Sequence, residues 1–312
     1  MSFRGKILVI RGGAIGDFIL TLPAIAALRR QFPEACLEVL GYPHIVQLAV
    51  AGGLVDRARS IDARPLAGFF ARHGELAEEL RDYFSEFDLI VSYLYDPDGI
   101  FRANVGRCSL AQFITGPHRP DEQERVHAAR IYLRPLERLA IFDADPVPRL
   151  SLKQPQAEPS PPNQLALHPG SGAERKNWPE ARWAVLLQRL ADFTELNLLL
   201  VGGEAEGERL QRLAATLPPA RTRVAQNLPL PVLASRLTHC LGFIGHDSGI
   251  SHLAAALGLP GIVLWGGSAQ EIWRPAGEKV VVIGHARGLT GLPVEEVMDK
   301  VRSVCAPAGV AF

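Results

Sequence analysis

The chain has little cysteine and no paired cysteines, which excludes a class of proteins at the outset. Its 312 residues include four cysteines at scattered positions, without a Cys-x-x-Cys pair. Small secreted domains rely on dense disulfides, and structural zinc sites rely on closely spaced ligands. We therefore expect neither a disulfide framework nor a zinc site.

The chain also lacks an excess of charge and a long apolar run. Lys plus Arg equals Asp plus Glu, at 33 each. Because nucleic-acid-binding proteins normally carry a basic excess, this balance argues against nucleic acid as a partner. No apolar run approaches the roughly 20 residues that span a bilayer, and the first apolar stretch is too short for a signal peptide. We expect a cytoplasmic protein of about two domains.

The most informative stretch of the sequence is Phe243–Pro275. A short apolar strand over 240–244 is followed by a polar turn over 245–249, a helix over 250–257 and a strand over 262–265. Such a turn leaves unpaired backbone N–H groups at the start of the helix. Together with the helix dipole, these groups favour an anion, above all a phosphate.

The polar side chains of this turn indicate a ligand site. Ser248 and His252 can donate hydrogen bonds to an anion, whereas Asp247 would repel phosphate and is better suited to accept from sugar or ribose hydroxyls. The alternative is that Asp247 or Ser248 only caps the helix and that His252 is an ordinary helix histidine. We favour the ligand site because the whole cluster follows a buried strand.

The segment Gly245–Gly258 resembles the donor-binding signature of the lipopolysaccharide heptosyltransferases, which use ADP-heptose. Their motif is close to Gly-x-Asp-Ser/Thr-Gly-x-x-His-Leu-x-Ala-Ala-Leu-Gly, and the chain matches every specified position. The resemblance implies that four residues bind the donor: Asp247, Ser248, Gly249 and His252.

The N-terminal stretch predicts a parallel βαβ unit with a Gly-rich turn. A strand over 7–10 leads into this turn, a helix follows over 17–31, and a second strand covers 37–40. The glycines do not form Gly-x-Gly-x-x-Gly, and the second strand lacks an acidic residue for a ribose. We therefore reject an NAD site here.

This N-terminal stretch also resembles the heptosyltransferases, whose first strand runs into a Gly-Asp turn and a Leu-Pro-Ala helix. The resemblance makes Asp17 the candidate general base, since a carboxylate can take the proton from an attacking sugar hydroxyl. Alternatively, Asp17 only stabilises the helix N-terminus. Three neighbours are assigned to the acceptor side: Arg11, Gly13 and Gly16. Together with Arg102, Arg107 and Arg119, Arg11 could also dock an acidic acceptor.

The middle of the chain predicts helices over 67–84 and 126–141 with a strand over 89–93 between them. Asp96-Pro97-Asp98 has the form of a metal-binding Asp-x-Asp, but its proline and the following glycine favour a turn. We expect no metal site. The Pro-rich stretch 153–164 predicts a linker between an acceptor-side domain, 1–152, and a donor-binding domain, 165–312.

The second domain begins with further matches to the family. Its turn after strand 165–167 carries Ser171 and Gly172, followed by Lys176 and a Trp-Pro helix start. The resemblance places Ser171 and Gly172 at the donor, and Lys176 is suited to neutralise the leaving diphosphate unless it is an ordinary surface lysine. An acid at the end of the next strand can hold ribose hydroxyls. Glu204 and Glu206 both qualify, and we favour Glu206.

The resemblance implies an α/β protein of the GT-B architecture, with two Rossmann-like parallel-sheet domains that face each other across a cleft. Its ligands lie at the carboxyl ends of the strands, and its last helix can pack on the first domain. The implied activity is inverting transfer of heptose from ADP-heptose to a lipopolysaccharide core saccharide, with no metal or other cofactor. We expect a core or lipid-linked acceptor and peripheral contact with the inner face of the inner membrane.

Two alternatives remain open on the sequence. The chain could be a transferase or an epimerase for a UDP- or GDP-linked sugar. It could also be a non-catalytic nucleotide-sugar binding protein, although such a protein would not need a base at Asp17.

Overall fold

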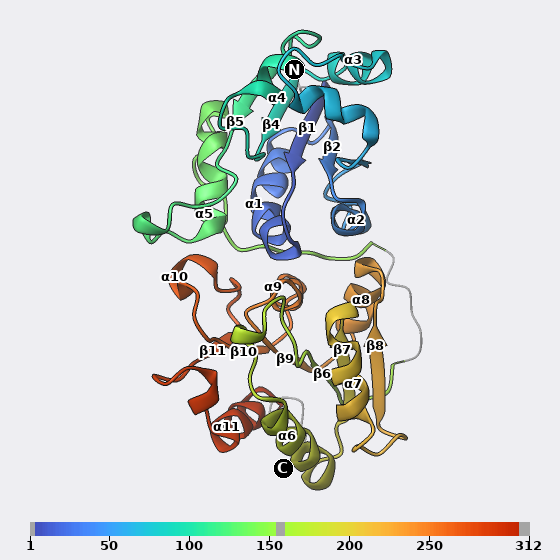
Figure 1. Ribbon diagram of the computed structural model, residues 1–312, viewed down its shortest axis with the longest axis vertical. Coiled ribbons are helices and arrows are strands. Elements are labelled where there is room, and N and C mark those ends of the chain that lie inside the picture. Colours follow the sequence, from blue (N-terminus) through green and yellow to red (C-terminus); the bar gives the residue numbers. More distant parts are fainter. Residues whose placement is uncertain (1–3, 154–159, 306–312) are drawn as a thin grey trace. The chain divides into compact units, whose positions relative to one another are not determined.

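The computed structural model describes residues 4–153 and 160–305, and the chain divides into two compact units (Figure 1). The first unit is 1–153 and the second is 154–312. Each unit is a parallel β-sheet with flanking helices. Part of the predicted linker, 154–159, lies outside the described residues.

The sheet of the first unit has the strand order β3-β2-β1-β4-β5, and all described pairs are parallel. The chain moves outward from β1 to β3 and then returns to the other side of β1 as β4. The strand order therefore reverses between β1 and β4, which is where open α/β sheets bind ligands. The strands are β1 (Lys6–Arg11), β2 (Cys36–Gly41), β3 (Arg57–Ser60), β4 (Leu89–Ser92) and β5 (Gln112–Thr115).

The helices of the first unit bury apolar side chains against this sheet. An aromatic cluster of Phe69, Phe84 and Phe101 fills one part of the core. The helices are α1 (Ile15–Gln31), α2 (Pro43–Ala51), α3 (Glu78–Ser85), α4 (Ile100–Val105) and α5 (Ala128–Leu133), with 3₁₀ turns η1 (Arg64–Phe70), η2 (Glu122–Glu124) and η3 (Arg134–Leu139).

Two helices predicted from the sequence are wrong in extent. The segment 67–84 is not one helix, because the chain folds back between η1 and α3. A Cβ on Gly74 would lie 2.0 Å from the carbonyl oxygen of Gly68, and His73 has a positive φ of 55°. The segment 126–141 divides into α5 and η3 just before Pro135, whose ring cannot continue an α-helix.

The sheet of the second unit has the strand order β11-β10-β9-β6-β7-β8 and is also parallel in every described pair. The chain runs outward from β6 to β8 and returns as β9, so the order reverses between β6 and β9. The strands are β6 (Gln164–Leu167), β7 (Asn197–Gly202), β8 (Thr222–Gln226), β9 (Gly242–His246), β10 (Gly261–Leu264) and β11 (Val280–Ile283).

The helices of the second unit complete a large core that includes the buried Trp178 and Trp183. They are α6 (Glu180–Phe193), α7 (Gly207–Ala214), α8 (Leu230–Leu237), α9 (Gly249–Ala256), α10 (Gln270–Trp273) and α11 (Val294–Cys305), with 3₁₀ turns η4 (Glu174–Lys176), η5 (Glu204–Glu206) and η6 (Leu289–Gly291). Among the residues the structure describes, no helix is long and apolar enough to cross a membrane.

The last described helix, α11, belongs to the second unit. It packs on α6 and β10, and its apolar face, including Val297 and Val301, is part of the second core. The expectation that the last helix packs on the first domain stays a prediction.

Candidate functional site

Polar turns follow four neighbouring strands of the second sheet. They are 168–172 after β6, 203–206 after β7, 247–248 after β9 and 265–268 after β10. Because these strands are parallel, the turns share the carboxyl edge of the sheet, where the β6–β9 switch point forms a natural ligand crevice. Most of the predicted donor residues lie in these turns.

An ion pair joins two of the predicted donor residues at this edge. Lys176 Nζ donates to Asp247 Oδ2 at 2.6 Å, and the Asp247 side chain is only 9% exposed. The hydroxyl of Ser268 donates to the same oxygen, and Trp265 Nε1 donates to the Ser268 carbonyl at 2.7 Å. Because both contacts use Oδ2, the other carboxylate oxygen can accept from a ligand hydroxyl.

Ser248 is the N-cap of α9, and its predicted contact with the donor stays a prediction. Its hydroxyl accepts from the Ser251 N–H at 3.4 Å and lies 3.2 Å from His168 Nδ1. Burial lowers the pKa of His168 to about 3, so its imidazole is neutral at physiological pH. Gly249 is the first residue of α9, and His252 is buried within the helix.

His246, which no sequence pattern singled out, connects the end of β9 with the turn after β6 and with the segment that precedes α6. Its Nε2 accepts from the Trp178 N–H at 2.8 Å, and its Nδ1 lies 3.1 Å from the Gly170 carbonyl. Nδ1 therefore carries the proton and donates to that carbonyl. Burial lowers the pKa of His246 to about 4, which keeps this neutral tautomer in place.

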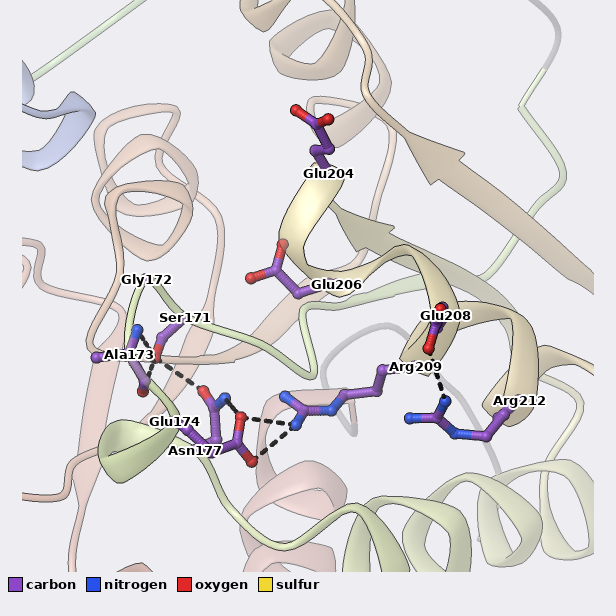
Figure 2. A pocket seen from close by; sticks show the side chains of 10 residues that line it. All are labelled: Ser171, Gly172, Ala173, Glu174, Asn177, Glu204, Glu206, Glu208, Arg209 and Arg212. Atoms are coloured by element: carbon purple, nitrogen blue, oxygen red, sulfur yellow. Dashed lines mark hydrogen bonds and ion pairs between the residues drawn. The ribbon is translucent and has the colours of Figure 1, made fainter.

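A polar pocket of about 450 Å³ lies between the turn after β6 and the start of α7 (Figure 2). Its lining carries both carboxylates and guanidinium groups, with little apolar surface. The lining residues are Ser171, Gly172, Ala173, Glu174, Asn177, Glu204, Glu206, Glu208, Arg209 and Arg212.

The two candidate ribose acids differ in this pocket. Glu206 is buried: its Oε2 accepts from the Gly203 N–H at 2.9 Å, and its side chain packs so closely on Gly170 that a Cβ there would lie 2.0 Å from Glu206 Cγ. Glu204 is exposed, and in Figure 2 its carboxylate points away from the other lining residues. The geometry therefore favours Glu206 over Glu204 as the candidate ribose acid, because only the Glu206 carboxylate is held in a defined position.

Hydrogen bonds hold the loop that carries Lys176. Ser171 is buried, and its hydroxyl lies 2.9 Å from the Ala173 carbonyl and 2.8 Å from Asn177 Oδ1. Arg209 donates to both carboxylate oxygens of Glu174 at 2.8 Å. The Ser171 hydroxyl thus has partners within the loop, while Gly172 is exposed and open.

In the first unit, Asp17 lies at the N-terminus of α1, directly after the turn that follows β1. Its Oδ2 accepts from the Ala14 N–H at 3.0 Å, and its side chain is 26% exposed. Gly13 has φ 98°, and a Cβ on it would lie 2.9 Å from Asp17 Oδ2, so the turn requires glycine there. Gly16 lies inside the first turn of α1. Asp17 therefore stabilises the helix start and remains accessible to a ligand.

The sequence suggested that Arg11 could dock an acceptor at the surface. The structure contradicts this, because Arg11 is only 3% exposed. Its guanidinium lies 4.5 Å from the ring centre of Tyr132 and donates to the His118 carbonyl at 2.9 Å. It also lies 3.7 Å from Asp17 Oδ1. Arg11 is thus an internal anchor behind Asp17.

Asp96 forms the turn that its sequence favours. Its two carboxylate oxygens accept from the N–H groups of Phe101 at 3.1 Å and Arg102 at 3.0 Å, at the start of α4. Across residues 4–153 and 160–305, no group of three or more His, Cys, Asp or Glu side chains is placed to hold a metal.

The second unit carries a polar pocket between the turn after β6 and the start of α7, and the first unit carries Asp17 directly after the turn that follows β1. Both lie at the carboxyl edge of a parallel sheet, where open α/β sheets bind ligands. Residues 137–299 match the family model of glycosyltransferase family 9 (heptosyltransferase), and the chain belongs to this family. It is therefore a glycosyltransferase of the heptosyltransferase type. The family assignment made from the sequence motifs is confirmed.

Relatives and solved structures agree with this assignment. The chain is 27% identical to lipopolysaccharide heptosyltransferase 1 of Pseudomonas aeruginosa, over 84% of this chain and 78% of that protein. It is 23% identical to lipopolysaccharide heptosyltransferase 3 of Escherichia coli, over 91% and 89%. The structure of E. coli ADP-heptose lps heptosyltransferase II has a TM-score of 0.80 at 18% identity, covering 97% of this chain and 99% of that one. The last similarity shows the shared GT-B fold, as predicted.

Proposed function

We propose that the chain transfers heptose from ADP-heptose to a saccharide of the lipopolysaccharide core, with inversion and without a metal. The observation that carries this proposal is the Lys176–Asp247 pair beside the N-terminus of α9. A cation and backbone N–H groups suit a diphosphate, and a carboxylate suits sugar hydroxyls. These groups meet at the switch point between β6 and β9.

The donor fits the second unit in three parts. The diphosphate lies against the first N–H groups of α9 and near Lys176, the ribose hydroxyls meet Glu206 in the polar pocket, and the heptose hydroxyls meet Asp247. An ADP-linked donor is supported by the relative E. coli heptosyltransferase WaaC, whose solved structures contain ADP and ADP-2-deoxy-2-fluoro heptose.

The transfer is a single displacement. Asp17 accepts the proton of an acceptor hydroxyl, whose oxygen forms a bond to the anomeric carbon from the face opposite the diphosphate. The bond between that carbon and the diphosphate oxygen breaks, so the configuration inverts and ADP leaves. Lys176 and the N–H groups of α9 stabilise the charge that develops on the leaving diphosphate, which is why we propose that no metal is needed.

The proposed acceptor is supported by the relatives, several of which are named lipopolysaccharide heptosyltransferases. We propose a core or lipid-linked saccharide acceptor and action in the cytoplasm, with peripheral contact at the inner face of the inner membrane. The chain has no excess of basic residues, which supports our proposal that nucleic acid is not a partner.

The first test is a thermal-shift panel of ADP, UDP, GDP and CDP, each with and without EDTA. A ligand that binds only the native state raises the unfolding midpoint by mass action. We expect a shift with ADP alone, unchanged by EDTA. A shift with UDP or GDP would replace the proposed donor, and no shift with any of the four would contradict the donor site.

The second test measures transfer itself. With ADP-heptose and deacylated lipopolysaccharide core oligosaccharides of increasing length, we expect ADP release only when acceptor is present. NMR of the product should show the inverted anomeric configuration. Donor turnover without acceptor would favour an epimerase, and an intact donor after long incubation with every acceptor would favour a binding protein.

A further inference from the structure

Two tyrosines that follow β4 have opposite environments. Tyr93 is 1% exposed, and its hydroxyl donates to the Tyr132 carbonyl at 2.6 Å. Tyr95, two residues on, is 69% exposed. Tyr93 packs inside the core of the first unit. The apolar ring of Tyr95, by contrast, is in contact with water at the carboxyl edge of the sheet, where ligands bind.

Tyr95 does not stand alone, because the ring of His118 lies beside it. The ring centres are 4.5 Å apart and the planes are inclined by 58°. His118 comes from the segment after β5, so two neighbouring strand ends bring the rings together. Partial desolvation, with the positive charges of Arg11 and Arg119, lowers the pKa of His118 below its usual value. The imidazole is therefore neutral at physiological pH, and the pair presents an uncharged aromatic surface.

The aromatic pair and Asp17 share one anchor. Arg11 donates to the backbone carbonyl of His118 at 2.9 Å, and the same guanidinium lies 3.7 Å from Asp17 Oδ1. It also donates to the carbonyl of Tyr93 at 3.4 Å. Because Arg11 is buried, it holds the strand ends and the acid in a fixed relation.

We propose that Tyr95 and His118 form a binding subsite for a sugar ring of the acceptor, next to Asp17. The C–H face of a sugar ring is apolar and packs well on an aromatic ring, while its hydroxyls remain at the rim and can form hydrogen bonds. An acceptor ring that stacks here would place one of its hydroxyls near Asp17, the carboxylate that we propose deprotonates this hydroxyl. This assignment rests on the proposed function, in which Asp17 is the base.

The test compares Tyr95→Ala and Tyr95→Phe with the wild type in the transfer assay with deacylated core oligosaccharides. Removal of the ring should raise the KM for the acceptor about tenfold, while the KM for ADP-heptose and the thermal shift with ADP stay unchanged. Tyr95→Phe retains the ring and should stay within about twofold of the wild type. His118→Ala should act in the same direction as Tyr95→Ala, since it removes the other ring but keeps the carbonyl that Arg11 uses.

Phe193 provides a matched control. It is 67% exposed, close to the value for Tyr95. It is the last residue of α6 and lies in the second unit, just before β7 begins. Phe193→Ala should leave both KM values unchanged. An unchanged acceptor KM in both Tyr95→Ala and His118→Ala would overturn the subsite while leaving the transferase intact. Absence of acceptor-dependent transfer by the wild type would instead refute the proposed function, and the subsite with it.

Discussion

Asp17 and Asp247 make an instructive pair, because each lies at the switch point of its own sheet and each is held differently. Asp17 is 26% exposed, with one backbone N–H on one oxygen and Arg11 3.7 Å from the other. Asp247 is 9% exposed and forms a 2.6 Å ion pair with Lys176, together with a hydrogen bond from Ser268. The same edge thus holds an accessible acid in one unit and a tightly bound acid in the other.

This difference matches two kinds of chemistry. A general base must meet the proton that it accepts and must exchange that proton afterwards, so it needs access and few fixed partners. A carboxylate that positions sugar hydroxyls benefits from being held rigidly. A side chain that is already fixed before binding loses less conformational entropy when the ligand binds. The comparison predicts that Asp17 variants affect turnover and that variants around Asp247 affect donor handling.

The largest effect is expected for Asp17→Asn. Asparagine keeps an oxygen that can accept from the Ala14 N–H, so the helix start is preserved, but it cannot take a proton at neutral pH. We expect kcat to fall by about 10²- to 10⁴-fold with an unchanged thermal shift for ADP. Glu78→Gln, which removes an acid from the first turn of α3, serves as the control. Normal donor binding together with wild-type turnover in Asp17→Asn would remove the base assignment.

Lys176→Met should have the next largest effect. It removes the positive charge that we propose stabilises the leaving diphosphate, and we expect kcat to fall by about 10²- to 10³-fold. Lys176→Arg should recover part of the activity because it keeps a charge. Lys279→Met, at an exposed lysine of the same unit, is the control. A variant that only unfolds at lower temperature, with full turnover, would reduce Lys176 to a structural partner of Asp247.

Glu206→Gln sharpens the comparison within the second unit. A hydrogen bond to a charged group contributes about 1.5–3 kcal/mol, so loss of the carboxylate should weaken ADP binding by roughly 10- to 100-fold. Glutamine keeps an acceptor for the Gly203 N–H. The exposed neighbour provides the control, since Glu204→Gln should change ADP affinity by less than about twofold, as measured by titration calorimetry. Equal losses in both variants would contradict the position assigned to the ribose.

The smallest effect concerns acid stability. The folded-state pKa of His246 is lowered to about 4 by burial, so the unfolded chain binds more protons between about pH 6.5 and 4. The contribution of His246 is therefore complete above its usual pKa and is lost as the pH falls. Between about pH 6.5 and 5 the unfolding free energy should drop by about 1.5 kcal/mol from this group.

The acid dependence can be assigned with two variants. Urea unfolding of His246→Gln should show a shallower loss of stability with falling pH than the wild type. His239→Gln, at an exposed position, should retain the wild-type dependence. Hydrogen exchange should place the acid-induced loss in the second unit, because the turns joined by His246 lie there. An unchanged slope in His246→Gln would show that its imidazole does not control this transition.

Local patterns were sufficient for much of the fold. Short apolar strands followed by glycine-containing turns predicted the strands that surround both switch points, and Gly258 has the left-handed φ of 81° expected of a helix C-cap. The predicted helix over 67–84 failed because its two glycines were overlooked. Most of this segment consists of residues that a helix accepts, but Gly68 and Gly74 allow the chain to fold back between η1 and α3.

Short-range patterns and motif spacing were enough to identify the family, the parallel α/β class and the residue types at the two turns. Which side chains meet depends on the three-dimensional arrangement of the chain. Lys176 pairs with Asp247 across 71 positions of the chain, His246 joins Gly170 to Trp178, and Arg11 is buried behind Asp17. Contacts of this kind depend on which strands become neighbours in a sheet, and a local pattern cannot specify that arrangement.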